Sequence, residues 1–154
     1  MQLRVDTYME YNSWFDEVTI DTLIDSLMIE VDLDVTLEVL FEDDLEGDRG
    51  GFCYAPEVFG EHGAHAWLTI SPKACEQDCE DILRTLCHEL IHLEQYVEGR
   101  LSEDHLQQTY SWLIPPWTFR AYPMGMEGEM PWEIEAEEKG RKLYDSFYRQ
   151  RPAP

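Results

Sequence analysis

The stretch from Asp78 to Glu98 constrains the fold most, because its pattern predicts one long amphipathic helix. Apolar side chains recur at alternating steps of three and four residues, the spacing that places them on a single helix face. They are Leu83, Leu86, Leu90, Leu93 and Val97. Gly99 follows directly and is a favoured residue just past a helix end. The chain must therefore provide a core against which this stripe can pack.

The segments before this helix predict one helix and three strands. The helix is expected over about residues 19–30, where Ile20, Leu23, Ile24, Leu27 and Val31 have helical spacing. The strands are expected in residues 34–41, 51–55 and 65–71. In the first strand the alternating residues Val35, Leu37, Val39 and Phe41 share one face.

After the long helix, residues 102–113 are expected to form one short helix, and the Pro- and Gly-rich residues 114–130 no regular structure. A final helix starts at Pro131, with Ala136, Gly140, Leu143 and Phe147 as its apolar stripe. This order predicts an α+β fold with a small sheet, and the 154 residues predict a single domain over residues 1–154.

Composition excludes several classes of function. Net charge is −22, from 33 acidic and 11 basic residues, so the surface repels nucleic-acid backbones and anionic membranes and attracts a basic partner. The N-terminus lacks the pattern of a secretory signal, and no apolar run is long enough to cross a bilayer. We therefore expect a cytoplasmic protein whose four cysteines are thiols.

The long helix also carries the sequence HELIH, residues 88–92. Residues four apart lie on one helix face, so His88 and His92 can point at one metal ion. Glu89 is rotated by about 100° from His88 and lies beside such an ion without binding it. Two histidine ligands and a neighbouring carboxylate are the arrangement that a metallopeptidase needs.

A catalytic zinc site needs a third protein ligand. The compact arrangement, with Gly and His three and six residues after the second histidine, is excluded because Gln95 and Glu98 stand there. His105 lies beyond the helix end, and the final helix supplies Glu133 and Glu135. Helical phase does not choose between these two glutamates.

Residues 82–139 resemble small zinc metallopeptidases of phages and bacteria, which belong to the broad zincin group and are similar to ImmA/IrrE and SprT-like peptidases. HELIHLEQY, a loop with aromatic residues, and PWEIEAEE carry the resemblance. It implies a minimal zincin fold in which a small sheet packs on the motif helix and a later helix brings a Glu ligand. It also implies that His88, His92 and Glu135 bind Zn²⁺ and that Glu89 is the catalytic acid/base.

The implied activity is hydrolysis of a peptide or protein substrate by a zinc-activated water, with Glu89 as the general base. Tyr110, Tyr122 and His105 are candidate donors to the oxyanion. Residues 65–71 correspond to the zincin edge strand that pairs with extended substrate, so we expect them to line the cleft.

Two other functions fit the sequence. One is a zinc-binding interaction module without catalysis, and the other is an acidic mimic of DNA that inhibits a nucleic-acid-binding protein. A second group, formed by His62, His65, Cys75 and Cys79, has spacings seen in structural zinc sites. A predicted strand separates its two halves, which favours ordinary reduced cysteines.

Overall fold

The computed structural model describes residues 3–10, 12–43, 45, 49–60, 63–115, 118–125 and 129–150. Within them the chain forms three helices and two sheets, so the α+β prediction is confirmed. The helices are α1 (Glu17–Ser26), α2 (Cys79–Val97) and α3 (Pro131–Gln150). The larger sheet consists of β1 (Arg4–Met9), β2 (Asp34–Phe41), β3 (Gly51–Cys53), β4 (Glu57–Phe59) and β5 (Gly63–Ile70). The smaller sheet consists of β6 (Leu101–Asp104), β7 (Thr109–Ile114) and β8 (Thr118–Pro123).

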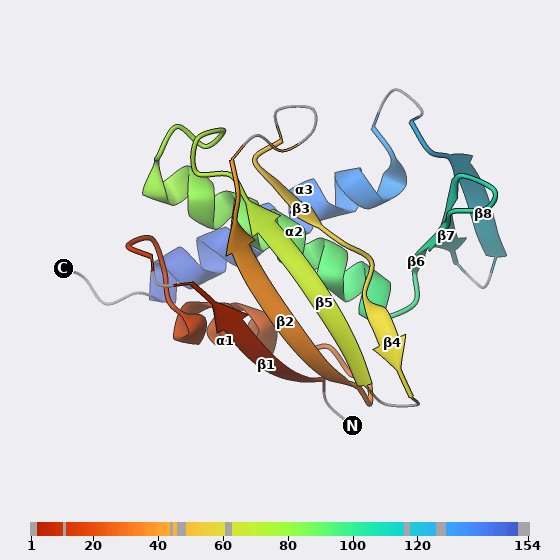
Figure 1. The fold of residues 1–154 in the computed structure, drawn as a ribbon, viewed down its shortest axis with the longest axis horizontal. Helices are drawn as coiled ribbons and strands as arrows, with labels where there is room; N and C mark the ends of the chain where they lie inside the picture. Colours follow the sequence, from red (N-terminus) through yellow and green to blue (C-terminus); the bar gives the residue numbers. More distant parts are fainter. Residues whose placement is uncertain are drawn as a thin grey trace.

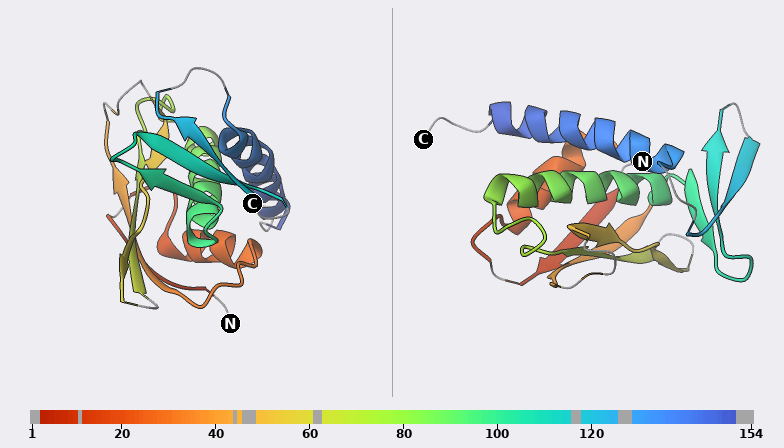
Figure 2. Two further views of the ribbon diagram at one scale, coloured as in Figure 1. Left: turned by 90° about the vertical axis from the view of Figure 1, so that its right-hand side faces the viewer. Right: turned by 90° about the horizontal axis from the view of Figure 1, so that it is seen from above.

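The elements form layers around one main core. Figures 1 and 2 show the larger sheet on one side, α2 packed across it, and α3 on the far side of α2. The smaller sheet stands apart at the end of the molecule where α2 ends and α3 begins. The core between sheet and helices holds Ile20, Leu23, Leu37, Leu68, Ile70, Ile82, Leu86 and Leu90, all buried. The layering places one face of α2 in the core and brings another beside the start of α3.

The larger sheet is mixed. β1 pairs with β2 and β2 with β5 in parallel, whereas β3 and β4 both run antiparallel to β5. The predicted alternation of β2 is confirmed, since Val35, Leu37 and Val39 are buried on the core side. β1 was not predicted, because its RVDTYM sequence is largely polar and it forms through pairing with β2, about thirty residues away in the sequence.

The first two helices begin at aspartate caps. The Asp16 side chain accepts a hydrogen bond from the Thr19 amide, and Asp78 accepts from the amides of Glu80 and Asp81. The predicted extent of α2 is confirmed, and Gly99 has a positive φ just past its end. The prediction for α1 ran too far: the helix ends at Ser26, and Met28 turns the chain with a positive φ.

Strands occupy residues 101–104, 109–114 and 118–123, so the prediction of a short helix over 102–113 was wrong. The prediction of irregular structure over 114–130 was wrong for Ile114 and for residues 118–123. The Asp104 side chain accepts from the amides of Leu106 and Gln107, which stabilises the turn between β6 and β7. Trp112 of β7 and Tyr122 of β8 pack on Trp132 of α3. This contact with a distant segment outweighs the local helix propensity of the hairpin residues.

The apolar stripe of α3 is confirmed, and its glycine lets two helices approach closely. Ala136, Gly140 and Leu143 are buried. A methyl group on Gly140 would lie 3.0 Å from the Cα atom and 3.2 Å from the amide nitrogen of His88. Because glycine lacks that methyl group, α3 can pack closely against the HELIH segment of α2.

We expect Gly140→Ala to lower the free energy of unfolding. Overpacking against backbone lowers the stability by about 1–3 kcal/mol, whereas the higher helix propensity of alanine raises it by about 1 kcal/mol. Chemical denaturation of the variant and of Glu138→Ala, a substitution of an exposed residue on the same helix, measures the difference. A Gly140→Ala protein more stable than the wild type would contradict this packing.

Two further expectations concern the chain as a whole. Cys53, Cys75, Cys79 and Cys87 are all free, as predicted. Among the described residues, no helix combines the length and the apolar character that crossing a membrane requires.

Candidate metal centre

Two histidines of α2 converge on one point. His88 and His92 lie one turn apart, and their ring centroids are 5.0 Å apart. Leu86 and Leu90 are buried in the core, so the helix is anchored while the imidazoles remain on its other side. The sequence prediction for the geometry of this pair is confirmed.

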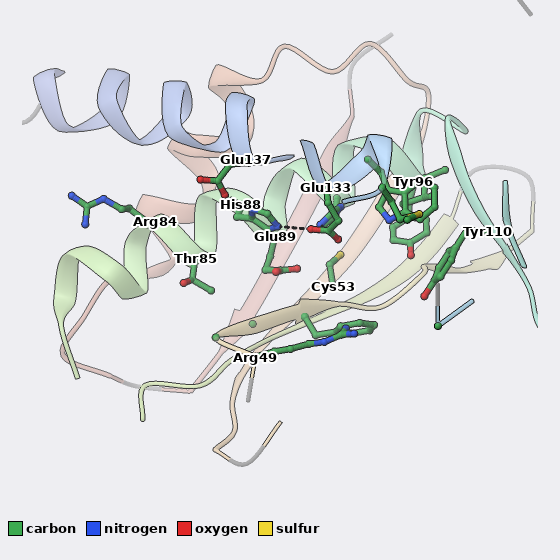
Figure 3. Close-up of a pocket in the computed structure, with 18 of the residues that line it drawn as sticks. Arg49, Cys53, Arg84, Thr85, His88, Glu89, Tyr96, Tyr110, Glu133 and Glu137 are labelled. Carbon is green, nitrogen blue, oxygen red and sulfur yellow. Dashed lines mark hydrogen bonds and ion pairs between the residues drawn. The ribbon is translucent and has the colours of Figure 1, made fainter. Parts of the chain in front are cut away.

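Glu133, in the first turn of α3, completes the group. Its Oε2 atom lies 3.2 Å from Nε2 of His88, and its Oε1 atom lies 3.1 Å from Nε2 of His92. The ligand atoms of these three residues lie within 4.8 Å of one another (Figure 3). Two imidazole nitrogens and one carboxylate oxygen at this spacing could hold a metal ion. Burial acts to raise the pKa of Glu133, but its hydrogen bonds with both histidines hold that pKa well below its ordinary value.

The choice of Glu135 over Glu133 is corrected by this geometry. The two oxygens of Glu135 lie 2.7 and 2.8 Å from Nη1 of Arg100, and Glu135 is not part of the histidine cluster. Two residues along a helix correspond to a rotation of about 200°, so both glutamates cannot face the same point. Because α3 is helical from Pro131 onwards, the direction of Glu133 is already fixed in the first turn.

His105 does not join the group either. It lies in the turn between β6 and β7, its side chain is exposed, and its Nε2 atom is 3.0 Å from Glu103.

Glu89 is buried beside the two histidines. Figure 3 shows its carboxylate below His88, facing Cys53 of β3. Burial raises the pKa of this carboxyl, and the neighbouring histidines act in the opposite direction. A methyl group on Gly51 would lie 3.1 Å from Cγ of Glu89 and 2.7 Å from Cγ2 of Thr85, so the glycine lets β3 cover the acid closely. The carboxylate is thus held next to the candidate metal centre without being part of it.

These side chains line a cleft of about 610 Å³. In Figure 3, Arg84, Thr85 and Glu137 lie on one side of the cluster, and Tyr96 and Tyr110 lie on the other. The second side is apolar and is completed by Leu101, Pro123, Met130 and Trp132. Trp132 packs against the aromatic rings of the smaller sheet, so that sheet builds the apolar end of the cleft.

Of the larger sheet, the strand that borders the cleft is β3, and the prediction for residues 65–71 was wrong in this respect. β5 lies inside the sheet, paired with β2 on one side and with β3 and β4 on the other. Residues 50–53 line the cleft, and in the described part of the chain β3 pairs with β5 alone. The sequence did not reveal this role, because β3 is only three residues long.

The proposed oxyanion donors differ in position. Tyr110 lines the cleft, whereas the ring of Tyr122 packs edge-on against Trp132, with the ring centroids 5.2 Å apart. Of the two, Tyr110 is the residue within the cleft.

The second cysteine–histidine group has no support. His62 lies outside the described residues. His65 contacts Glu38 at 3.1 Å and stacks on Trp67, at the start of β5. Cys75, beyond the other end of that strand, contacts the Thr85 hydroxyl. β5 therefore keeps the two halves of the group apart.

Comparison of the chain with known protein families, with characterised proteins and with solved structures gives no match.

Proposed function

We propose that this chain is a zinc-dependent peptidase, with His88, His92 and Glu133 as zinc ligands and Glu89 as general base. The observation that carries the proposal is the convergence of these four side chains in one cleft. Two nitrogens and one oxygen, with a further position open towards a cleft, form a donor set typical of catalytic zinc. The resemblance of HELIH and PWEIEAEE to small zincin-type peptidases supports the same assignment.

The roles of the side chains follow from their positions. Bound zinc would polarise a carbonyl group and lower the pKa of water. A carboxylate oxygen of Glu89 takes a proton from the attacking water and passes it to the leaving nitrogen. The burial that raises the Glu89 pKa brings it closer to the range in which a group both accepts and donates a proton near neutral pH. Tyr110 is the candidate donor to the oxyanion from the opposite side of the cleft.

The shape of the cleft favours an extended peptide as the substrate. In the described residues β3 pairs with β5 alone, so its other edge offers backbone groups for pairing with a peptide strand. The side chains around Trp132 and Tyr110 would accept a large apolar residue next to the cleaved bond. The net charge of −22 would attract basic substrates, and the free cysteines suit a reducing compartment such as the cytoplasm.

The test begins with protein freed of metal by a chelator. We expect it to take up about one zinc ion per chain, and the reloaded protein to cleave members of a mixed peptide library beside large apolar residues. Mass spectrometry of the metal content and of the products measures both outcomes. A chain that binds no zinc would overturn the proposal and favour an acidic DNA mimic. Zinc binding without any cleavage would favour a non-catalytic interaction module.

A further inference from the structure

Gln95 connects the two segments that carry the metal cluster. It lies on α2, three residues after His92, and is fully buried. Its Oε1 atom lies 2.8 Å from Nδ1 of His92. Its Nε2 atom donates to the carbonyl oxygen of Trp132 at 3.0 Å and to Oε1 of Glu135 at 3.2 Å. One side chain thus contacts a histidine of the cluster and the helical turn that presents Glu133.

The two acceptors on α3 determine which way the amide of Gln95 faces. A backbone carbonyl and an ionised carboxylate can only accept hydrogen bonds, so the amide nitrogen must be directed towards Trp132 and Glu135. The amide oxygen is then directed towards His92. An oxygen in this position requires a proton on Nδ1 of His92.

Glu135 is itself held by two basic side chains. Arg100 binds both of its oxygens, and Nζ of Lys139 lies 3.6 Å from Oε1. Both of these side chains are cationic and can only donate hydrogen bonds, so Glu135 meets them as a charged acceptor. The residue therefore stays an ionised acceptor for Gln95. The ion pair of Glu135 and Arg100 therefore orients the amide of Gln95, although neither residue touches the histidine cluster.

We propose that Gln95, oriented by Glu135, is a positioning residue that holds a hydrogen on Nδ1 of His92 and so leaves Nε2 as the ring nitrogen available to a metal ion. Nε2 is the nitrogen that faces Glu133 and His88. A metal ligand needs a lone pair on this nitrogen, and the bond to the second ring nitrogen fixes its direction. The same amide ties α2 to the first turn of α3 and so sets the position of Glu133 relative to His92. Only the consequence for metal binding rests on the proposed function.

The tautomer can be read in metal-free Glu133→Ala protein, because in the wild type the Glu133 carboxylate lies 3.1 Å from Nε2 of His92 and itself favours a proton there. Long-range proton–nitrogen NMR correlations of ¹⁵N-histidine-labelled protein, recorded at a pH where the imidazoles are neutral, distinguish the protonated from the unprotonated ring nitrogen. We expect His92 of this variant to carry its proton on Nδ1. When Gln95→Leu is added, which removes all three hydrogen bonds of the amide, we expect a mixture of tautomers. A proton on Nε2 of His92 in the Glu133→Ala protein would overturn the inference.

Zinc affinity, measured by competition with a chelator, gives the second readout. Loss of a hydrogen bond to a ligand histidine typically costs about 10–100-fold in metal affinity, and we expect a decrease in this range for Gln95→Leu. Glu135→Gln removes the charged acceptor and leaves the carbonyl of Trp132, so it should shift the tautomers and weaken zinc binding in the same direction but by less. Glu138→Gln makes the same change at an exposed site of α3 and should alter neither.

The variants separate this inference from the proposed function. If Gln95→Leu does not fold, Glu135→Gln still tests the orientation of the amide, because it removes only one charge at a half-buried site. Unchanged tautomers and unchanged zinc affinity in a folded Gln95→Leu or Glu135→Gln protein would overturn the positioning role. A wild type that binds no zinc, together with a proton on Nδ1 of His92 in the Glu133→Ala protein, would refute the peptidase proposal and leave the role of Gln95 intact.

Discussion

Replacing Glu89 by glutamine is expected to abolish peptide hydrolysis while zinc content and fold are retained. Glutamine has the shape of glutamate but cannot accept the proton of the attacking water, and general-base catalysis contributes about 10²–10⁴-fold to a rate. Burial acts against the charged form of the Glu89 carboxyl and raises its pKa, so a neutral amide of the same size fits without a large cost in stability. Initial rates on any peptide that the wild type cleaves measure the loss.

The control for this variant is Glu80→Gln, which changes an exposed glutamate in the first turn of the same helix. It should retain the wild-type rate. Wild-type turnover in a folded, zinc-loaded Glu89→Gln protein would remove Glu89 from the mechanism and assign the proton transfer to another group.

The second large effect concerns the choice of the third ligand. We expect Glu133→Ala to weaken zinc binding by more than about 100-fold, because two histidines alone leave the ion without the third protein ligand that such sites require. Glu135→Ala should cost about tenfold, since its carboxylate acts only through Gln95. His105→Ala should change nothing, because its side chain is exposed in the β6–β7 turn.

Chelator competition on the three single variants measures this order directly, with the free energy of unfolding of each metal-free protein as the control for folding. The double variant His88→Ala, His92→Ala should lose nearly all zinc. A larger loss for Glu135→Ala than for Glu133→Ala would mean that the first turn of α3 is rotated from its position in the structure, and Gln95 would then have a different role.

Much of the candidate site could be predicted from the sequence, because helical geometry depends on local spacing. The four-residue step between His88 and His92, the offset of Glu89 and the leucine stripe all follow from the period of the helix. Gly99 and Pro131 mark where α2 ends and α3 begins, since their backbone preferences act on the residues next to them.

Three features of the site were decided only by the tertiary structure, because they depend on contacts between segments far apart in the chain. The register between α2 and α3 brings Glu133 to the histidines and turns Glu135 towards Arg100. The aromatic contacts of Trp132 favour strands in residues 109–114 and 118–123 in place of the predicted helix and loop. The order of strands decides that β3, and not residues 65–71, borders the cleft. Local spacing determines which side chains share one face of a helix. How that face is oriented towards another helix or strand depends on packing between them, which the sequence of one segment does not determine.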